Sequence, residues 1–115
     1  MTRNNQDKKE HSGYEKKVLD SLVKKIEKLG VMKEYRKDEF LFQAEDEASG
    51  FFYVLSGAVR VFKMDENGKE VEVARLKPGD FLGEAIVFVS DKFPSFAQAL
   101  RKSHILFFGK RKILE

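Results

Sequence analysis

The chain has 115 residues, a length typical of one domain, and 42% of them are hydrophobic, which predicts a globular fold with its own core. It has no cysteine, which excludes disulfides, zinc fingers and cysteine nucleophiles, and no apolar run in it is long enough to cross a membrane. The net charge is +3, but residues 31–91 hold 8 basic and 13 acidic residues, so the body is acidic and both ends are basic.

The basic excess at the ends is expected to be solvated surface charge, because a nucleic-acid site needs basic residues gathered on one face. Residues 1–13 are polar and without periodicity, which predicts a flexible tail, and residues 14–115 are expected to form one domain. The start of the chain does not have the composition of a signal peptide, so we expect a cytoplasmic protein that does not bind membranes.

An amphipathic helix is predicted over residues 14–29, ended by Gly30. Its apolar residues recur at helical spacing: Val18, Leu19, Leu22, Val23, Ile26 and Leu29. We expect this stripe to pack on the core, because it is wide and contains no aromatic anchor; the alternative is a basic helix that lies on a membrane surface.

From Met32 onward the pattern is that of short strands separated by turn residues. Strands are predicted at residues 32–36, 39–43, 51–55, 58–64, 71–76 and 103–108. Turns are predicted at 37–38, 65–68 and 78–80, and residues 110–115 could begin a final helix of about one turn. This order predicts a mainly β domain, a small antiparallel barrel or jelly roll.

A candidate anion site is predicted at residues 83–85, after the turn at 78–80. A strand that runs into Gly83, Glu84 and Ala85 leaves backbone N–H groups beside a carboxylate, and such groups hold anions at helix N-termini and in backbone nests. The segment Pro94–Leu100 follows ten residues later. Together the two segments could hold an anion with one part and a hydroxyl with the other.

The residues 51–61, 67–71 and 76–84, in this order and spacing, resemble the cyclic-nucleotide-binding β-roll, in particular the effector domain of CRP/FNR transcription regulators. The resemblance runs from about Val18 to the end of the chain. It implies a double-stranded β-helix, or jelly roll, with an N-terminal helix and a truncated C-terminal helix. It also implies a small-molecule effector, a homodimer in the full-length form, and DNA binding only through a domain that this chain does not contain.

The resemblance also assigns roles in a ligand site. Gly83 would let the backbone approach a cyclic phosphate, Glu84 would accept from the ribose hydroxyl, Ala85 fits the small position after it, and Ser95 fits the hydroxyl position. The phosphate-binding arginine of the family falls at Pro94, which has neither a charge nor an N–H group. A cyclic nucleotide is therefore the implied ligand, but conventional cAMP binding is not expected.

The segment Pro94–Leu100 is similar to the FNR branch, whose iron–sulfur cluster requires cysteines that this chain lacks. A second hypothesis follows: a stand-alone interaction or dimerisation module whose vestigial pocket is filled by Phe93 or Phe96. A third, a cupin-like metalloenzyme, lacks ligands, because the two histidines are His11 in the tail and His104 in an apolar strand, where it is expected to be a hydrogen-bonded core or edge residue.

No set of nucleophile, base and orienting residue is recognised, so the chain is not expected to be an enzyme. The phenylalanines, including Phe88, are assigned to the core. The family often has glycine where this chain has Asp38 and Ala44, and alanine tolerates positive φ poorly. We therefore expect the loop 43–50 to differ from the family in shape.

Overall fold

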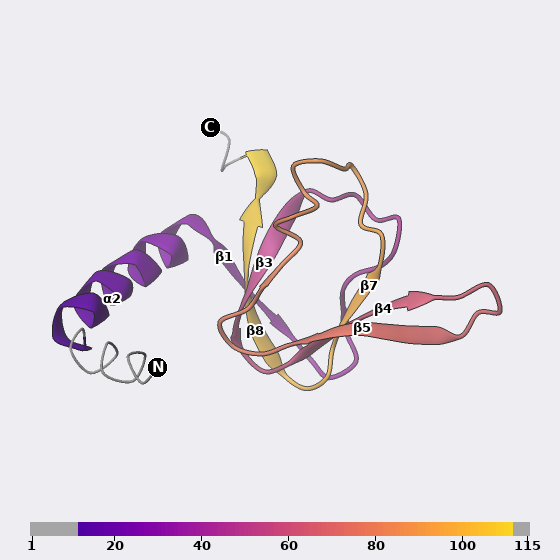
Figure 1. The fold of residues 1–115 in the computed structure, drawn as a ribbon, viewed down its shortest axis with the longest axis horizontal. Helices are drawn as coiled ribbons and strands as arrows, with labels where there is room; N and C mark the ends of the chain where they lie inside the picture. The colour runs from indigo at the N-terminus through magenta and orange to yellow at the C-terminus, as the bar shows by residue number, and fades with distance from the viewer. Residues whose placement is uncertain (1–11, 112–115) are drawn as a thin grey trace, which may run out of the picture.

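Residues 12–111 are described in the computed structural model of the protein, drawn in Figure 1. The predicted tail, residues 1–13, lies outside them as far as residue 11, and Ser12 and Gly13 belong to a helix instead. Residues 112–115 of the predicted final helix, 110–115, also lie outside them. The predicted N-terminal helix is confirmed as α2 (Ser12–Leu29), which begins two residues earlier than expected. Lys110 and Arg111 begin a helical turn after the last strand, as predicted.

Eight strands form two four-stranded antiparallel sheets. The first sheet has the order β1 (Val31–Tyr35), β8 (Ser103–Gly109), β3 (Gly50–Ser56) and β6 (Phe81–Leu82). The second has the order β2 (Phe40–Phe42), β7 (Phe96–Ala99), β4 (Val59–Met64) and β5 (Glu70–Leu76). Every connection crosses between the sheets except the β4–β5 hairpin, which projects from the roll (Figure 1). This confirms the predicted jelly roll.

The strand β7 was not predicted, and β6 was predicted only as the strand that runs into Gly83, without bounds. β6 has only two residues, too few for an alternating pattern. β7 pairs with both β2 and β4 and alternates buried Ala97 and Ala99 with partly buried Phe96 and Gln98. Alanine favours strands weakly, so tertiary packing against β4, rather than local propensity, decides this strand.

The core lies between the two sheets. Its largest fully buried side chains include Phe62, Ile105, Val54, Val59 and Val87. The assignment of Phe88 to the core is wrong, because this residue is 45% exposed on the turn after β6, where only the preceding Val87 points inward. Phe93, in contrast, is 3% exposed.

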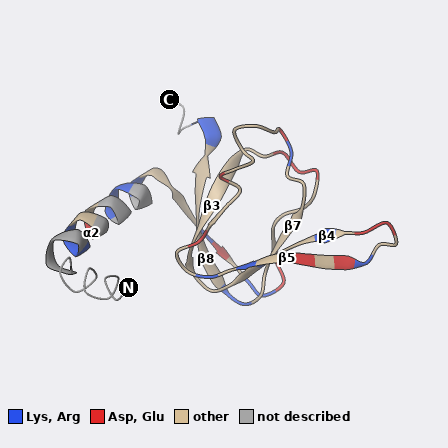
Figure 2. Cartoon of the chain, in the orientation of Figure 1, with Lys and Arg blue, Asp and Glu red and all other residues tan. Residues whose placement is uncertain are grey.

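The expectation that α2 packs on the core is wrong for the side chains that are described on its apolar stripe. Val18 and Leu29 are 41% and 47% exposed. Figure 1 shows the helix leading away from the roll, because Gly30 passes directly into β1. Figure 2 shows lysines along α2 and at the end of β8, and acidic residues on the β4–β5 hairpin, in keeping with the predicted uneven charge.

Two residues other than glycine have positive φ. Asp38 has φ 74°, at the first position where the family often has glycine. The second is Glu45, with φ 75°, and not Ala44 as the comparison with the family suggested. Here the Gln43 N–H donates to the Asp46 carboxylate (2.8 Å) and the Glu45 N–H donates to the Phe93 carbonyl (2.9 Å), which places the left-handed residue one position later.

Candidate functional site

The first half of the predicted ligand site is a tight turn that follows β6. Gly83 has φ +89°, a conformation that favours glycine, and its carbonyl accepts from the N–H groups of Ile86 (3.1 Å) and Val87 (3.0 Å). Val87 is fully buried and anchors the turn in the core. Glu84 and Ala85, at the start of the turn, are exposed.

The second half of the site lies directly before β7. Pro94 is exposed, whereas Ser95 is 7% exposed. The two halves are adjacent, because a Cβ atom added to Gly83 would lie 3.2 Å from the Phe93 ring. The structure therefore brings together Gly83 and the segment that contains Pro94, as the resemblance implies, while the ligand roles of Gly83, Glu84, Ala85 and Ser95 stay predictions.

Phe93 fills the space beside Gly83. Its ring stacks on Phe42, with ring centroids 3.7 Å apart and an angle of 9° between the ring planes. Backbone hydrogen bonds hold it on both sides: its N–H donates to Asp46 (3.0 Å) and its carbonyl accepts from Glu45 (2.9 Å). Sequence reasoning named Phe93 only as one of two residues that could fill the pocket.

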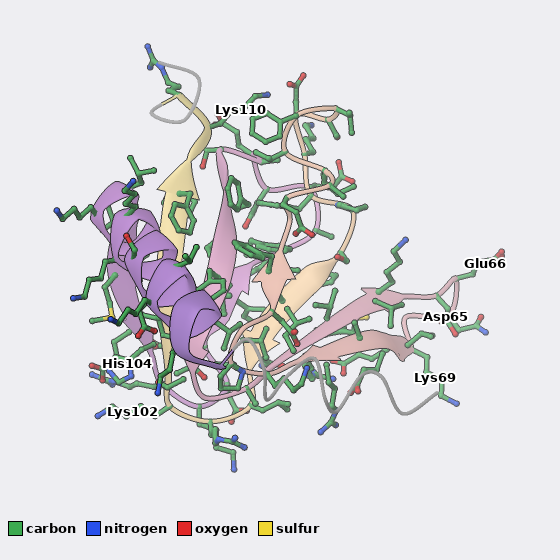
Figure 3. The ribbon with its side chains drawn as sticks, turned by 60° about the vertical axis from the view of Figure 1, so that its left-hand side comes forward. Asp65, Glu66, Lys69, Lys102, His104 and Lys110 are labelled. Atoms are coloured by element: carbon green, nitrogen blue, oxygen red, sulfur yellow. The ribbon has the colours of Figure 1, made fainter. Side chains whose placement is uncertain are left out.

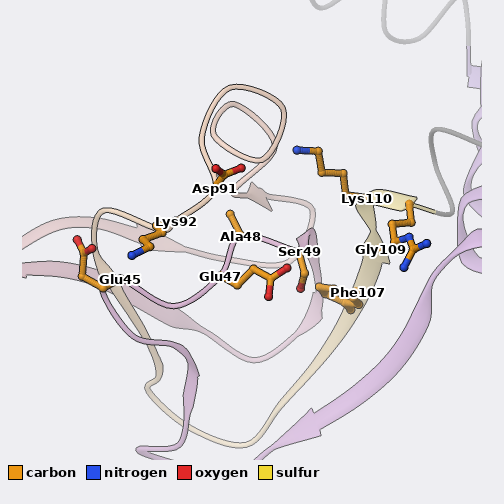
Figure 4. A pocket seen from close by; sticks show the side chains of 10 residues that line it. Glu45, Glu47, Ala48, Ser49, Asp91, Lys92, Phe107, Gly109 and Lys110 are labelled. Carbon is orange, nitrogen blue, oxygen red and sulfur yellow. The ribbon is translucent and has the colours of Figure 1, made fainter.

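Two cavities open near this site without including it. One has a volume of about 230 Å³, and its aromatic lining consists of Tyr35, Phe42, Phe52, Phe93 and Phe107. The other, of about 570 Å³, lies between the loop that contains Glu47 and the end of β8 (Figure 4). Gly83, Glu84, Ala85 and Ser95 line neither cavity, and Phe93 stands between Gly83 and the smaller one.

Tyr35 in the smaller cavity is expected to resist ionisation. Burial, and secondarily the negative charge of Glu39, raises the pKa of Tyr35 above its ordinary value of 10.0. Because the raised pKa belongs to the folded state, this neutral tyrosine contributes stability that is complete below pH 10 and is lost as the pH rises through the folded pKa.

An alkaline absorbance titration of the wild-type protein and of Tyr35→Phe should therefore differ by a tyrosine that ionises above pH 10. The stability of Tyr35→Phe should also fall less steeply at alkaline pH. A difference titration centred at or below the ordinary tyrosine value would show that this side chain is not desolvated.

The structure also contains a serine–histidine–glutamate chain that the sequence did not reveal. The Ser56 hydroxyl lies 2.9 Å from His104 Nδ1, and Glu34 Oε1 lies 3.4 Å from His104 Nε2. The expectation that no such set exists is wrong as geometry, because β3, β8 and β1 bring together residues distant in sequence. His104 is partly buried and partnered on both ring nitrogens, as expected of a hydrogen-bonded histidine; Figure 3 shows it beside Lys102, at the opposite end of the roll from Lys110.

The hydrogen-bonded and ionic contacts of Ser56, His104 and Glu34 are best explained as a polar link between three strands. None of the three residues lines either of the cavities, so no substrate space adjoins Ser56 in these two. Lys102 Nζ also lies 3.5 Å from the Glu34 carboxylate. Among residues 12–111, no group of three or more histidine, aspartate or glutamate side chains could hold a metal ion.

The family of this chain is shown by the match of its sequence to a protein-family model. Residues 32–115 match the family model described as the cyclic nucleotide-binding domain. The chain belongs to this family. The predicted resemblance is thus confirmed, and the region covered is the effector-domain region of CRP/FNR regulators.

Similar proteins include several bacterial regulators. The chain is 34% identical over 88 residues to the Anaerobic regulatory protein of Aggregatibacter actinomycetemcomitans, covering 76% of this chain and 32% of that protein. It is 39% identical over 54 residues to the cAMP-activated global transcriptional regulator CRP of Pasteurella multocida, covering 47% and 26%. A solved transcriptional regulator from Thermotoga maritima superposes with a TM-score of 0.73 at 28% identity, covering 80% and 72%.

The chain spans about a third of the length of the first of these relatives. None of the helices described in residues 12–111 is long and apolar enough to cross a membrane.

Proposed function

We propose that this cyclic nucleotide-binding-type domain is the regulatory effector domain of a CRP/FNR-type transcription regulator, without enzymatic activity. The observation that carries the proposal is the match of residues 32–115, which contain the β-roll from the second residue of β1 onward, to a family whose similar members are named as regulators. In the full-length protein we expect a homodimer that contacts DNA through a further domain.

We further propose that the family's nucleotide site does not operate here in its usual form. A buried phosphate needs a paired cation, and Pro94 stands where the guanidinium would be. The Phe93 ring, stacked on Phe42, lies against Gly83, where the ligand backbone contact is expected. Both features oppose tight binding of cAMP or cGMP at this site.

We expect ligand binding to affect the rest of the full-length protein through the end of β8. The Lys110 N–H donates to the Ser49 carbonyl (2.8 Å), which ties the first residue after β8 to the loop before β3. A ligand that displaces this loop would change how the following segment leaves the roll, which is a shift between two populations of the domain.

The regulatory proposal is tested by chromatin immunoprecipitation of the native gene product, with an antibody raised against the roll and a gene-deletion strain as control. Enrichment of a small set of promoter fragments over the deletion strain is expected. Absence of any enriched DNA under all growth conditions tried would contradict it. Purified wild-type protein and Ser56→Ala should hydrolyse a p-nitrophenyl ester at the same rate, because Ser56 lines neither of the two cavities.

A second function, the stand-alone interaction or dimerisation module, is favoured by the filled pocket and by β5. This strand is at the edge of its sheet and exposes Val71 and Val73, which are 47% and 53% exposed. Light scattering of the chain separates the two cases: a dimer that Val73→Lys abolishes would support the module, whereas a monomer at all concentrations would remove it.

A further inference from the structure

The two cavities of the roll meet at Glu47, Ser49 and Phe107, which line both of them. These three residues are referred to as the junction. Figure 4 shows the Glu47 carboxylate on the same side of the larger cavity as Ser49 and Phe107. The junction is separate from the predicted ligand site, since none of the residues of that site lines either cavity.

The ring of Phe107 is held in place by the backbone. A Cβ atom added to Gly50 would lie 2.7 Å from Phe107 Cε1, so the ring packs directly on this glycine. The Phe52 ring is 5.2 Å away, centroid to centroid, and tilted by 56°. Phe107 lines both cavities, and the face of an aromatic ring attracts cations.

The chain itself places a cation over this ring. Lys33 Nζ lies 4.6 Å from the centroid of Phe107, and Lys33 also lines the smaller cavity. The other charged residues of that cavity are Asp46 and Glu47, both acidic. An ammonium group is therefore favoured at the junction by a ring face and by carboxylates, while a phosphate would be repelled by the same carboxylates.

The larger cavity carries both signs of charge. Glu45 and Asp91 add two carboxylates, and Lys92, Lys110 and Arg111 add three cations. Figure 4 shows Lys110 extending from the end of β8 on the Asp91 side of the cavity, away from the junction. Lys110 therefore points away from the junction, and Glu47 is the charged residue that lines both cavities together with Phe107.

We propose that the junction binds a small organic cation, an alkylammonium head group of the size of trimethylammonium, between the Glu47 carboxylate and the Phe107 ring. A ligand of this class would be the signal that the effector domain proposed above senses. The regulatory meaning of the inference rests on that proposed function, but the binding itself does not. Ser49 supplies the link, because its carbonyl accepts the hydrogen bond from Lys110 at the exit of β8.

The test is a titration of the purified chain with choline chloride at constant ionic strength, followed by backbone amide chemical shifts. The matched control is 3,3-dimethylbutan-1-ol, which has the same shape without the charge. Choline should shift the amides of Glu47, Ser49 and Gly109 saturably in the millimolar range, and the neutral alcohol should not. Equal binding of the alcohol, or no saturable shift with choline, would overturn the proposal.

Single substitutions test whether choline binds at the junction. Glu47→Gln, at an exposed position, and Phe107→Leu should each weaken choline binding about fivefold or more, and Lys33→Met should strengthen it by removing the internal competitor. Glu66→Gln at the hairpin tip (Figure 3) should leave the affinity unchanged. Unchanged binding in Glu47→Gln would contradict the assignment even if Phe107→Leu unfolds. A negative titration leaves the DNA-enrichment result unaffected, so the two proposals fail separately.

Discussion

Replacing Gly57 with alanine is expected to lower the free energy of unfolding by about 2–5 kcal/mol, the sum of a left-handed backbone and an overpacked contact. Gly57 has φ +96° at the crossing from β3 to β4, and an added methyl group would overlap the Ser103 side chain. Ser103 is fully buried; its hydroxyl accepts from the Ala58 N–H (3.1 Å) and donates to the Arg101 carbonyl (2.8 Å). The methyl group would therefore displace a buried polar network as well.

The matched control is Gly68→Ala in the β4–β5 turn. Gly68 has φ +79°, but nothing lies within 4 Å of an added Cβ atom, so this variant should lose only about 1 kcal/mol. Urea unfolding of the two variants and the wild-type protein gives both values. Equal losses for Gly57→Ala and Gly68→Ala would mean that the close packing of Gly57 on Ser103 is absent in solution.

Replacing Phe93 with alanine is expected to destabilise the domain by about 3–5 kcal/mol, because it removes a buried ring from a stacked pair and leaves a cavity. The ring contacts Phe42 on one face and adjoins Gly83, so its removal would join the smaller cavity to the predicted ligand site. Denaturant unfolding measures the loss, and a structure of the variant shows whether the two spaces merge.

Phe88→Ala provides the comparison within the same segment. Phe88 is exposed and lies beside the Phe51 ring, with centroids 6.3 Å apart and planes tilted by 57°, so its loss should cost about 1 kcal/mol or less. If Phe93→Ala were no more destabilising than Phe88→Ala, Phe93 could not be the side chain that closes the site.

Most of the fold could be predicted because its signals are local. The strand β4 was predicted to begin at Ala58, one residue before its observed start at Val59, and to end at Met64 as observed; the turn at Gly68 has the expected positive φ. The strand β7 could not be predicted, since its stability comes from pairing with β2 and β4. The outward course of α2 was also missed, because a wide apolar stripe predicts a partner but not which partner covers it.

The ligand roles of the predicted site residues stay predictions, and the neighbouring junction was not predicted. Gly83 and Pro94 identified the family site, and the structure places their segments together. The junction of Glu47, Ser49 and Phe107 joins a loop to the end of β8, and no sequence spacing connects them. The same holds for Ser56, His104 and Glu34, which lie on three strands.

We propose that Pro94 and Phe93 prevent this domain from binding a cyclic nucleotide in the way usual for the family. Isothermal titration calorimetry of the chain with cAMP, at protein concentrations that detect millimolar affinity, tests it most directly. We expect no saturable heat, since no guanidinium is available to pair with the phosphate and a stacked ring lies against Gly83. Saturable binding of cAMP in the micromolar range or tighter would contradict it.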